Sequence, residues 1–279
     1  MPNTTLMNYR ALAIDLDGTL LVGEDLPDAN RDALRAASAA GLTVIIATAR
    51  WKEMAFRVAD AAGLTDPVIA CSGAQVHDRS NSQDLFDERL PADFTAELFA
   101  LCDEQRCIAT VTVDEDVLLK LDGKPDPEAL DAKMRWVPKL SPTFDPDNLP
   151  RIAAIQGSAI NNLIRSELAP RFSATVNYFD SVGPSGKLIS TITAKAADKG
   201  AALKATCEHL DIDPATILAI GDAENDLAMF ALAGTAVAMG QAEDRIKAAA
   251  QFVTGRNDEA GVAQVINRLL DDGKLESSQ

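Results

Sequence analysis

Short apolar runs alternate with longer segments of helical periodicity along the first part of the chain. Residues 11–14 and 42–48 are short, apolar and uncharged, which is typical of buried strands. Residues 27–41 and 52–63 have helical patterns, and both end in a glycine, a common helix terminator. Residues 66–73 have the composition of a third strand. This alternation predicts a parallel sheet with helices on both faces.

The pattern changes between residues 82 and 193. Short alternating and hairpin-like runs appear there, separated by a connection at 121–150 that is rich in proline and aspartate. Such runs favour an α+β unit over a continuation of the parallel sheet. The expected strands and helices of this unit are residues 91–105, 107–113, 116–121, 151–157, 171–179 and 187–193.

After residue 193 the first rhythm resumes. The expected elements are helices at 198–213, 224–234, 242–250 and 258–273, and strands at 216–222, 235–240 and 251–254. The fold class predicted is therefore α/β, with a Rossmann-like, doubly wound parallel sheet as the core domain. This core comprises residues 1–81 and 194–279, and residues 82–193 form an inserted α+β cap domain.

The composition excludes some classes of partner. The 279 residues are 47% hydrophobic, which suffices for an ordinary buried core. The formal net charge of -16 argues against nucleic acid, because proteins that bind it usually carry a basic surface. It does not argue against a phosphate substrate, since a bound cation can supply local positive charge.

The remaining composition indicates a cytoplasmic protein. Four cysteines occur without a C-x-x-C pair, so we expect reduced thiols. The start, MPNTTLMNYR, lacks the basic end and apolar stretch of an export signal. No apolar run approaches the roughly 18 residues of a membrane span, and no membrane partner is expected. We expect a monomer or a weak homodimer.

Polar residues follow several of the expected strands. Ligands of open parallel sheets bind beyond the carboxyl ends of the strands, so we expect these residues to share one site. They are Asp15 and Asp17 after the first strand, Thr48 and Arg50 after the second, Ser72 and Gly73 after the third, Asp222, Asn225 and Asp226 after a later strand, and Lys199 just before a helix.

Each of these features alone has an ordinary explanation. A single D-x-D after a strand is more often a turn or a helix cap, and a single lysine is usually a solvated surface charge. Several carboxylates at one sheet edge, however, repel one another unless a cation is bound. Oxygen ligands in small number suit Mg²⁺, which keeps water and takes further ligands from substrate phosphate. The combination therefore predicts a Mg²⁺ site.

Two aspartates one residue apart can divide the work of phosphate ester hydrolysis. Asp15 is ionised at neutral pH and can attack phosphorus without a separate base. A cation and a lysine would cancel its repulsion with the phosphate. Asp17, two residues along an extended chain end, is expected to point the same way and to serve as general acid and base.

The motifs resemble those of a known family. DLDGTLL, IIATAR, the region of Lys199 and GDAENDLAMF are similar, in order, to the four motifs of the haloacid dehalogenase superfamily. The D-x-D-G-T form is that of its phosphatases and phosphomutases. The insert at 82–193 resembles the α/β cap of the Cof-like subfamily, as do CSGAQVHD and the segment AVAMGQAEDRIKAAAQFVTGRNDEAGVA. The resemblance covers nearly the whole chain.

The resemblance implies a role for each matching residue. Asp15 would be the nucleophile, Asp17 the acid and base, and Thr48 a ligand of a phosphoryl oxygen. Lys199 would neutralise the phosphoryl group. The implied metal set is Asp15, the backbone carbonyl of Asp17, Asp222 and, through the water shell, Asp226. The implied substrate-binding set is Gly18, Ser72, Gly73, Asn225 and Asn257.

The chain departs from the family pattern at two places. Ser72-Gly73-Ala74 stands where Asn-Gly-Ala is frequent, and Ala49 replaces a glycine of the second motif. Both positions bear on the phosphate loop or the near side of the substrate. Substrate specificity is expected to come from residues of the cap. For each candidate residue, a purely structural role at the surface or in the core of the cap is an equally open interpretation. These candidates are Arg135, Trp136, Asn161 and Asn162.

The function implied is a Mg²⁺-dependent phosphatase acting through a phospho-aspartate. Its partner would be a small phosphorylated metabolite, either a sugar phosphate or a phosphorylated cofactor. One alternative is a phosphomutase of the phosphomannomutase type, which would return an isomeric ester instead of free phosphate. The other is a non-catalytic binding protein on the same fold, which would be expected to lack one of the reactive residues.

Overall fold

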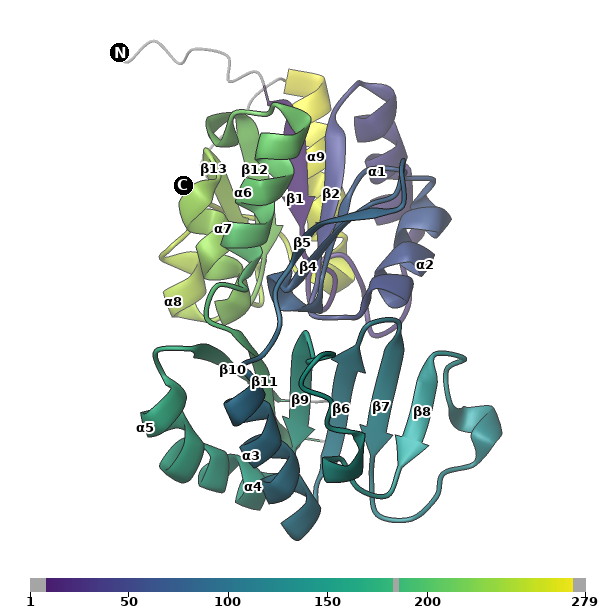
Figure 1. Cartoon of the computed structure of the whole chain (residues 1–279). Coiled ribbons are helices and arrows are strands. Elements are labelled where there is room, and N and C mark those ends of the chain that lie inside the picture. Colours follow the sequence, from purple (N-terminus) through teal and green to yellow (C-terminus); the bar gives the residue numbers. More distant parts are fainter. Residues whose placement is uncertain (1–8, 183–185, 273–279) are drawn as a thin grey trace. The chain divides into compact units, whose positions relative to one another are not determined.

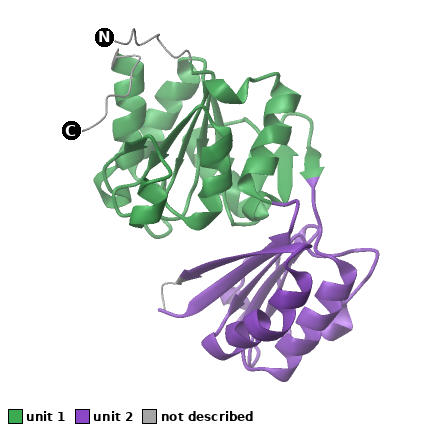
Figure 2. Ribbon diagram, turned by 90° about the vertical axis from the view of Figure 1, so that its left-hand side faces the viewer, with its two compact units in different colours: residues 1–86, 198–279 green, residues 87–197 purple. Residues whose placement is uncertain are grey.

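A computed structural model describes residues 9–182 and 186–272 (Figure 1). The chain divides into two compact units, unit 1 with residues 1–86 and 198–279 and unit 2 with residues 87–197 (Figure 2). Both boundaries lie a few residues beyond those expected at 82 and 193. The first eight residues, on which the expectation of no export signal rests, and residue 273 of the last expected helix lie outside the described residues. No helix in the described ranges is long and apolar enough to cross a membrane.

Unit 1 is built on an eight-stranded sheet in the described part of the chain. The strands run β14-β13-β12-β1-β2-β3-β4-β5 across it. All pairs from β14 to β3 are parallel, and β4 is antiparallel to β3. The bounds are β1 Ala11–Ile14, β2 Thr43–Ala47, β3 Val68–Ala70, β4 Gln75–Asp78, β5 Gln83–Asp87, β12 Ile217–Gly221, β13 Thr235–Ala238 and β14 Phe252–Val253.

The strand β4 and the edge strand β5 were not expected. The polar sequence QDLFD of β5 carries little strand signal, because only two of its five residues are apolar and none is fully buried. The sequence therefore assigned residues from 82 onward to the insert, whereas the structure joins this strand to the sheet of unit 1.

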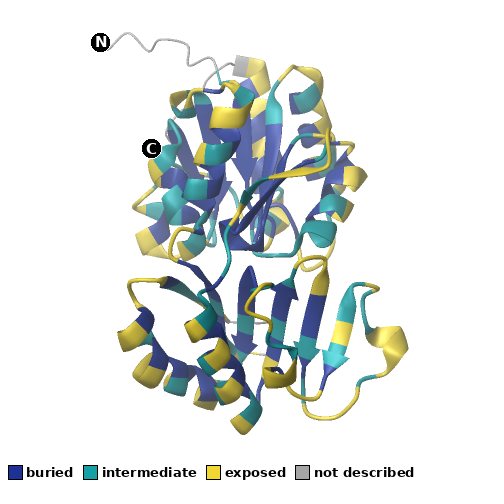
Figure 3. Ribbon diagram, in the orientation of Figure 1, coloured by how far each residue is buried: buried dark blue, intermediate teal, exposed yellow. Residues whose placement is uncertain are grey.

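Helices cover both faces of the sheet in unit 1. Along β1, Leu12 and Ile14 contact one apolar cluster and Ala11 and Ala13 contact another, as the period of two of a strand requires. Both faces are buried, which explains why the strand contains no charge (Figure 3). One face is covered by α1 (Asp28–Ala39), α2 (Lys52–Ala62) and α9 (Gly261–Asp272), and the other by α6 (Lys199–Leu210), α7 (Leu227–Leu232) and α8 (Asp244–Lys247).

The register of the parallel strands brings distant residues to one edge. Ile14 of β1 lies level with Ile46 of β2 and with Ile220 of β12. The residues that follow these strands therefore emerge side by side, with Asp15 between the turns that contain Thr48 and Asp222. This is the edge where the sequence predicted a site.

Unit 2 has a six-stranded sheet in the order β10-β11-β9-β6-β7-β8, antiparallel except for the parallel pair β7 and β8. Apolar residues of α3 and of the segment from α4 to α5 pack on this sheet. The bounds are β6 Ile108–Val113, β7 Asp116–Lys120, β8 Met134–Val137, β9 Ile152–Gln156, β10 Val176–Val182, β11 Leu188–Ala194, α3 Ala92–Glu104, α4 Ser158–Leu163, a π-helical turn Ile164–Leu168 and α5 Ala169–Phe172.

Three details of unit 2 were decided only by the structure. The connection at 121–150 contains β8, whose short run pairs with β7 at the sheet edge. The expected element at 171–179 begins as the end of α5, and only its second half belongs to β10. Asn161 is a core residue, because its Nδ2 donates to Ile155 O at 3.0 Å and to Leu188 O at 3.2 Å, joining α4 to β9 and β11.

Asn30 of α1 holds the turn that follows β1. Its side chain is fully buried; Nδ2 donates to Leu20 O at 2.9 Å, and Oδ1 accepts from Ala263 N at 3.0 Å. The amide therefore connects α1, the turn after β1 and the start of α9. A buried polar group that loses its partner costs more than the hydrogen bond contributed, so this residue is sensitive to substitution.

We expect Asn30→Leu to lower the free energy of unfolding by about 2–4 kcal/mol, since it leaves two buried backbone groups unpaired. Denaturant unfolding measures this. Asn162→Leu makes the same chemical change at an exposed helical position and should shift stability by less than about 0.5 kcal/mol. Equal effects of the two variants would show that the Asn30 network contributes nothing specific.

Candidate active site

The turn after β1 folds tightly around Asp15. The Asp15 N–H donates to Ile220 O of β12 at 3.0 Å, and Leu20 N donates back to Asp15 O at 3.3 Å. Gly18 has a φ of 82°, and a Cβ atom there would lie 2.4 Å from Asp222 Oδ2. Glycine is therefore required both by the backbone conformation and by the close approach of Asp222. Thr19 Oγ1 donates to Asp222 Oδ1 at 3.2 Å.

Lys199 lies at the first position of α6, behind the helix cap made by Asp198, whose carboxylate accepts from Ala201 N at 2.8 Å. The lysine side chain is fully buried. Its Nζ donates to Asp15 Oδ1 at 2.5 Å and to Asp226 Oδ1 at 2.6 Å. The expectation of a lysine at the site was thus sound in placement, and the ordinary interpretation of Lys199 as a surface charge was wrong.

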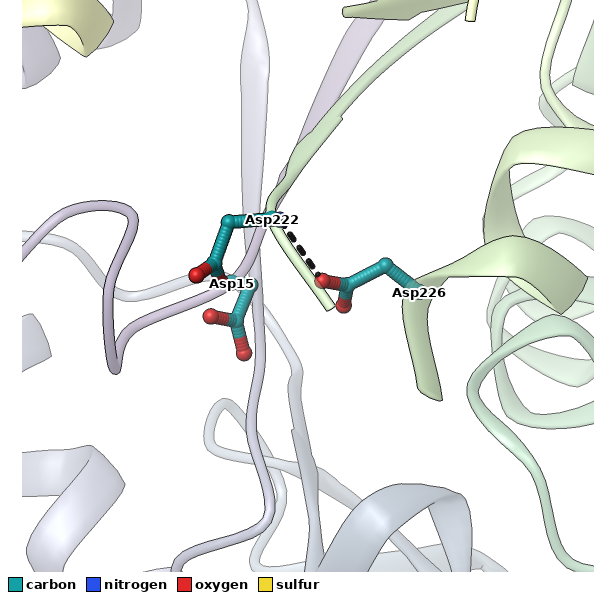
Figure 4. Close-up of side chains that lie close together, drawn as sticks. All are labelled: Asp15, Asp222 and Asp226. Carbon is teal, nitrogen blue, oxygen red and sulfur yellow. Dashed lines mark hydrogen bonds between the residues drawn. The ribbon is translucent and has the colours of Figure 1, made fainter. Parts of the chain in front are cut away.

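Asp226 is fully buried and connects Lys199 with the loop that contains Asp222. Its second oxygen accepts from the backbone N–H groups of Asp222 at 2.9 Å and Ala223 at 3.0 Å. Figure 4 shows Asp226 approaching the backbone of Asp222 from the turn before α7. Because both of its oxygens already accept from protein donors, Asp226 orients Lys199 and the Asp222 loop rather than presenting a free oxygen.

The three aspartates form a group suited to a divalent cation. One oxygen each of Asp15, Asp222 and Asp226 lies within 4.8 Å of the others. Three carboxylates face a single ammonium group in this buried cluster, which leaves two negative charges in excess. Hard oxygen donors and this excess fit Mg²⁺ in both ligand type and charge. Asp15 and Asp222 are the side chains best placed to bind it.

Burial governs the protonation of this cluster. Burial raises the pKa of Asp15 well above its usual value, against the opposing charge of Lys199. Burial and the neighbouring Asp226 raise the pKa of Asp222 to about 6. Burial alone would lower the pKa of Lys199, but the charges of Asp15 and Asp226 outweigh it and raise the pKa, so the lysine is protonated at neutral pH. A bound cation would favour the ionised form of both acids.

Asp17 does not join the three aspartates through its side chain. Its carboxylate is half exposed and accepts from Arg50 at both oxygens: Oδ1 accepts from Nη2 at 2.6 Å and from Nε at 3.2 Å, and Oδ2 accepts from Nε at 2.9 Å. Arg50 Nη1 donates to Glu24 at 2.7 Å. The sequence placed Arg50 at this edge without giving it a role. The expected contribution of Asp17 to metal binding concerns its backbone carbonyl and stays a prediction.

Two hydroxyl groups lie at the ends of β2 and β3. Thr48 is fully buried, and its Oγ1 accepts from Arg50 N at 3.1 Å, so its own proton is free to be donated. Ser72 N donates to Thr48 O at 2.9 Å. Ser72 is buried with a φ of 55°, and among the described residues its Oγ has no hydrogen-bond partner. A buried hydroxyl without a partner is costly, which favours a bound ligand as its acceptor or donor.

Gly73 is explained by packing. A Cβ atom there would lie 2.2 Å from the backbone O of Asp198 and 2.6 Å from Lys199 N. The glycine, at φ 94°, thus lets the start of α6 approach the turn after β3, and this approach positions the lysine. Its expected role in substrate binding stays a prediction. The same holds for Asn225, which is half-buried in the turn Glu224–Asp226.

Gln241 is a site residue that the sequence reasoning missed. Its Nε2 donates to Gly18 O, its side chain hydrogen bonds to Asp222, and its Oε1 accepts from Asn257 N at 3.1 Å. It follows β13 closely, so the rule that located the other residues at strand ends could have found it. Asn257 supports the same turn, because its Nδ2 donates to Leu21 O at 2.9 Å. Its role in substrate binding stays a prediction.

Comparison with known proteins agrees with this geometry. A sequence model of the haloacid dehalogenase-like hydrolases matches residues 12–266. The chain is 30% identical to the 5-amino-6-(5-phospho-D-ribitylamino)uracil phosphatase YwtE of Bacillus subtilis, over 94% of this chain and 98% of that protein. It is 26% identical to the pyridoxal phosphate phosphatase YbhA of Escherichia coli, over 93% and 98% respectively.

The fold also has a close match among solved structures. A haloacid dehalogenase-like hydrolase from Bacteroides thetaiotaomicron superimposes with a TM-score of 0.79 at 22% identity, covering 94% of this chain and 99% of that one. At this identity the likeness concerns the fold alone. It confirms the predicted fold class, an α/β Rossmann-like core with an inserted second unit.

We expect Mg²⁺ to raise the midpoint of thermal unfolding, and to do so more at about pH 7.5 than at about pH 5. Asp222 has a folded-state pKa of about 6, above its unfolded value of 3.8. Protonated Asp222 therefore contributes its full stabilisation below pH 3.8, and this stabilisation is lost as the pH rises through the folded-state pKa of about 6. The cation binds the ionised carboxylate and recovers this loss only above about pH 6.

Thermal melts with and without Mg²⁺ at the two pH values test this expectation. Asp222→Asn removes one titrating group and serves as the control, so its gain should be smaller and should depend less on pH than that of the native chain. An equal gain for the native chain at both pH values would contradict the assignment of Asp222 to the cation.

Proposed function

The chain belongs to the haloacid dehalogenase-like hydrolases and is a phosphoric monoester hydrolase, and we propose that it acts through a phospho-aspartate on Asp15 with the help of Mg²⁺. The observation that carries the proposal is the buried contact between Lys199 and Asp15 within a cluster that has two negative charges in excess. Such a cluster provides a fixed nucleophile and a place for a cation, both of which phosphoryl transfer needs.

The first step follows from the position of Asp15. Its carboxylate attacks phosphorus, an O–P bond to Asp15 forms, and the bond from phosphorus to the ester oxygen breaks. The leaving oxygen takes a proton from Asp17. Lys199, held in place by Asp226, keeps its charge beside the transferring group and disperses the charge that develops there. Bound Mg²⁺ would supply further neutralisation of the phosphoryl oxygens.

The second step regenerates the enzyme. Asp17, now ionised, takes a proton from water, and the resulting hydroxide attacks phosphorus and releases phosphate from Asp15. Thr48 and Ser72 offer hydroxyl groups for the phosphoryl oxygens in both steps. Arg50 holds both oxygens of Asp17, so we assign it the role of orienting the acid and base.

The substrate we propose is a small phosphorylated metabolite, either a sugar phosphate or a phosphorylated cofactor. The names of two relatives support this class, one acting on a phosphoribityl-uracil and the other on pyridoxal phosphate. Unit 2 would act as the cap that selects the rest of the substrate. Arg135, Trp136 and Asn162 remain candidates there, since Arg135 and Asn162 are exposed and Trp136 is half-buried. We propose a cytoplasmic enzyme, monomeric or weakly dimeric, without nucleic-acid or membrane partners.

The decisive experiment measures free phosphate released from a panel of sugar phosphates, pyridoxal phosphate and flavin mononucleotide, with Mg²⁺ and with excess chelator. Release that requires Mg²⁺ supports the proposal. An isomeric ester in place of free phosphate would identify a phosphomutase instead. Binding without any turnover would identify a non-catalytic protein.

We expect Asp15→Asn to lower kcat by at least about 10³-fold on every ester of the panel, because the variant keeps the size of the side chain but loses the attacking anion. Phosphate release measures this loss. Asp28→Asn makes the same change at an exposed position of α1 and should leave kcat unaltered. Near-native turnover by Asp15→Asn would remove Asp15 from the role of nucleophile.

We expect Arg50→Lys to lower kcat about tenfold with little change in KM, because an ammonium group cannot reproduce the two-point contact that orients Asp17. Steady-state kinetics on the best ester separates the two constants. Glu24→Gln keeps the contact of Arg50 with Asp17 and should have a much smaller effect. A rise in KM alone would instead make Arg50 a substrate-binding residue.

A further inference from the structure

Unit 2 contains a buried lysine beside a cysteine pair. Lys120 ends β7 with only 3% of its surface exposed. Its Nζ donates to Gln105 O at 3.0 Å and to Cys107 Sγ at 3.6 Å. Within the described ranges no carboxylate lies within 4 Å of Nζ, and the carboxylate of Asp122 lies 3.7 Å from Arg106 Nε. A buried ammonium without an anion is rare and costly.

Cys107 is the group that can supply the missing anion. It lies between α3 and β6, 7% exposed, and its sulfur lies 3.6 Å from the backbone oxygen of Cys102 on α3. As a neutral thiol it donates to Cys102 O at 3.6 Å, whereas as a thiolate it accepts from Lys120 Nζ at 3.6 Å. The ionised form therefore balances the charge of Lys120.

Some of the charged groups around the two cysteines oppose ionisation of the thiols, and others favour it. Asp122 faces Cys107 and Asp103 faces Cys102, and these carboxylates oppose ionisation. The hydrogen bond from Cys102 and the charge of Lys120 nevertheless outweigh burial and Asp122, and lower the pKa of Cys107 to about 7. Burial and the hydrogen bond to Cys107 raise the pKa of Cys102. The pair thus consists of one reactive sulfur and one protonated neighbour.

A cavity of about 420 Å³ is lined in part by Cys107. Cys107 lines it together with Arg106, Ile108, Gln156, Gly157 and Lys187. Arg106 and Lys187 are exposed cations on this lining. The cavity offers a small reagent a path to a side chain that is otherwise largely buried.

We propose that Cys107, Lys120 and Cys102 form a peroxide-sensitive thiol site in unit 2, separate from the phosphatase residues. The Cys107 thiolate attacks one oxygen of hydrogen peroxide; an S–O bond forms, the O–O bond breaks, and hydroxide leaves with the bonding electrons. The resulting sulfenic acid meets the Cys102 thiol. An S–S bond then forms, the S–O bond breaks, and the hydroxyl group leaves as water with the thiol proton.

The other cysteines of the chain are suitable internal controls. Cys71 and Cys207 are buried in unit 1, and burial raises the pKa of Cys207 to about 11. Alkylating agents and peroxide are therefore expected to react much faster with Cys107 than with the cysteines of unit 1 in the same molecule.

The first test is limited alkylation of the native full-length chain with iodoacetamide, followed by peptide mass spectrometry. At about pH 7 Cys107 should react at least about tenfold faster than Cys207, and Lys120→Met should lower its rate about tenfold. Lys120→Arg keeps the cation and should retain most of the rate. Lys187→Met removes an exposed cation of the cavity and should change the rate less than twofold.

A rate for Cys107 no higher than that of Cys207 would overturn the proposal. So would an unchanged rate in Lys120→Met, provided that its far-UV circular dichroism matches that of the native chain. If Lys120→Met does not fold, the pH dependence of alkylation in the native chain decides: a midpoint near 7 supports the ion pair, and one above about 8.5 overturns it.

The second test treats the native chain with hydrogen peroxide. A cross-link between Cys102 and Cys107, with loss of two hydrogens, is the expected product. In Cys102→Ser the sulfenic acid of Cys107 should accumulate and be trapped by dimedone. If Cys107 is oxidised in the native chain without any cross-link, Cys102 does not act as its partner, and an unmodified Cys107 overturns the whole proposal.

Discussion

The fully buried ammonium group of Lys199 is the constraint on which the core of this molecule depends. It contacts Asp15 after β1 and Asp226 before α7, so it joins three segments that are far apart in the sequence. Removing either carboxylate would weaken the compensation of a fully buried charge, which proteins tolerate poorly. The strands on either side are apolar on both faces and cannot supply a substitute partner.

Close backbone approaches make this arrangement possible. Gly73 lets the start of α6 approach the turn after β3, Gly18 leaves room for Asp222, and a Cβ atom at Gly221 would lie 2.5 Å from the Asp226 carboxylate. These glycines stand at points where a side chain would displace one of the charged groups. The charged groups of the site can therefore occupy their positions only because glycines stand beside them.

The two units place their charges differently. In unit 1 the buried lysine is balanced by more carboxylates than it can neutralise, which creates the demand for a cation. In unit 2 the buried Lys120 has no carboxylate within ion-pair distance, and the deficit falls on a thiol. Both proposed sites, for phosphoryl transfer in unit 1 and for a thiol in unit 2, therefore follow from the same physical requirement, that a buried charge needs a partner.

The sequence determined the parallel core sheet, because uncharged runs such as residues 11–14 must be buried on both sides. It also indicated which polar residues would lie at one edge, because residues after parallel strands meet there whatever the details of packing. The polar edge strand β5 and the short β8 escaped prediction, since their stability comes from neighbouring strands and not from their own composition. Only the tertiary structure decided that Arg50 holds Asp17, that Gln241 joins Gly18 to Asp222, and that Asn161 belongs to the core of unit 2. Each of these is a contact between segments whose separation in space cannot be read from their separation in sequence.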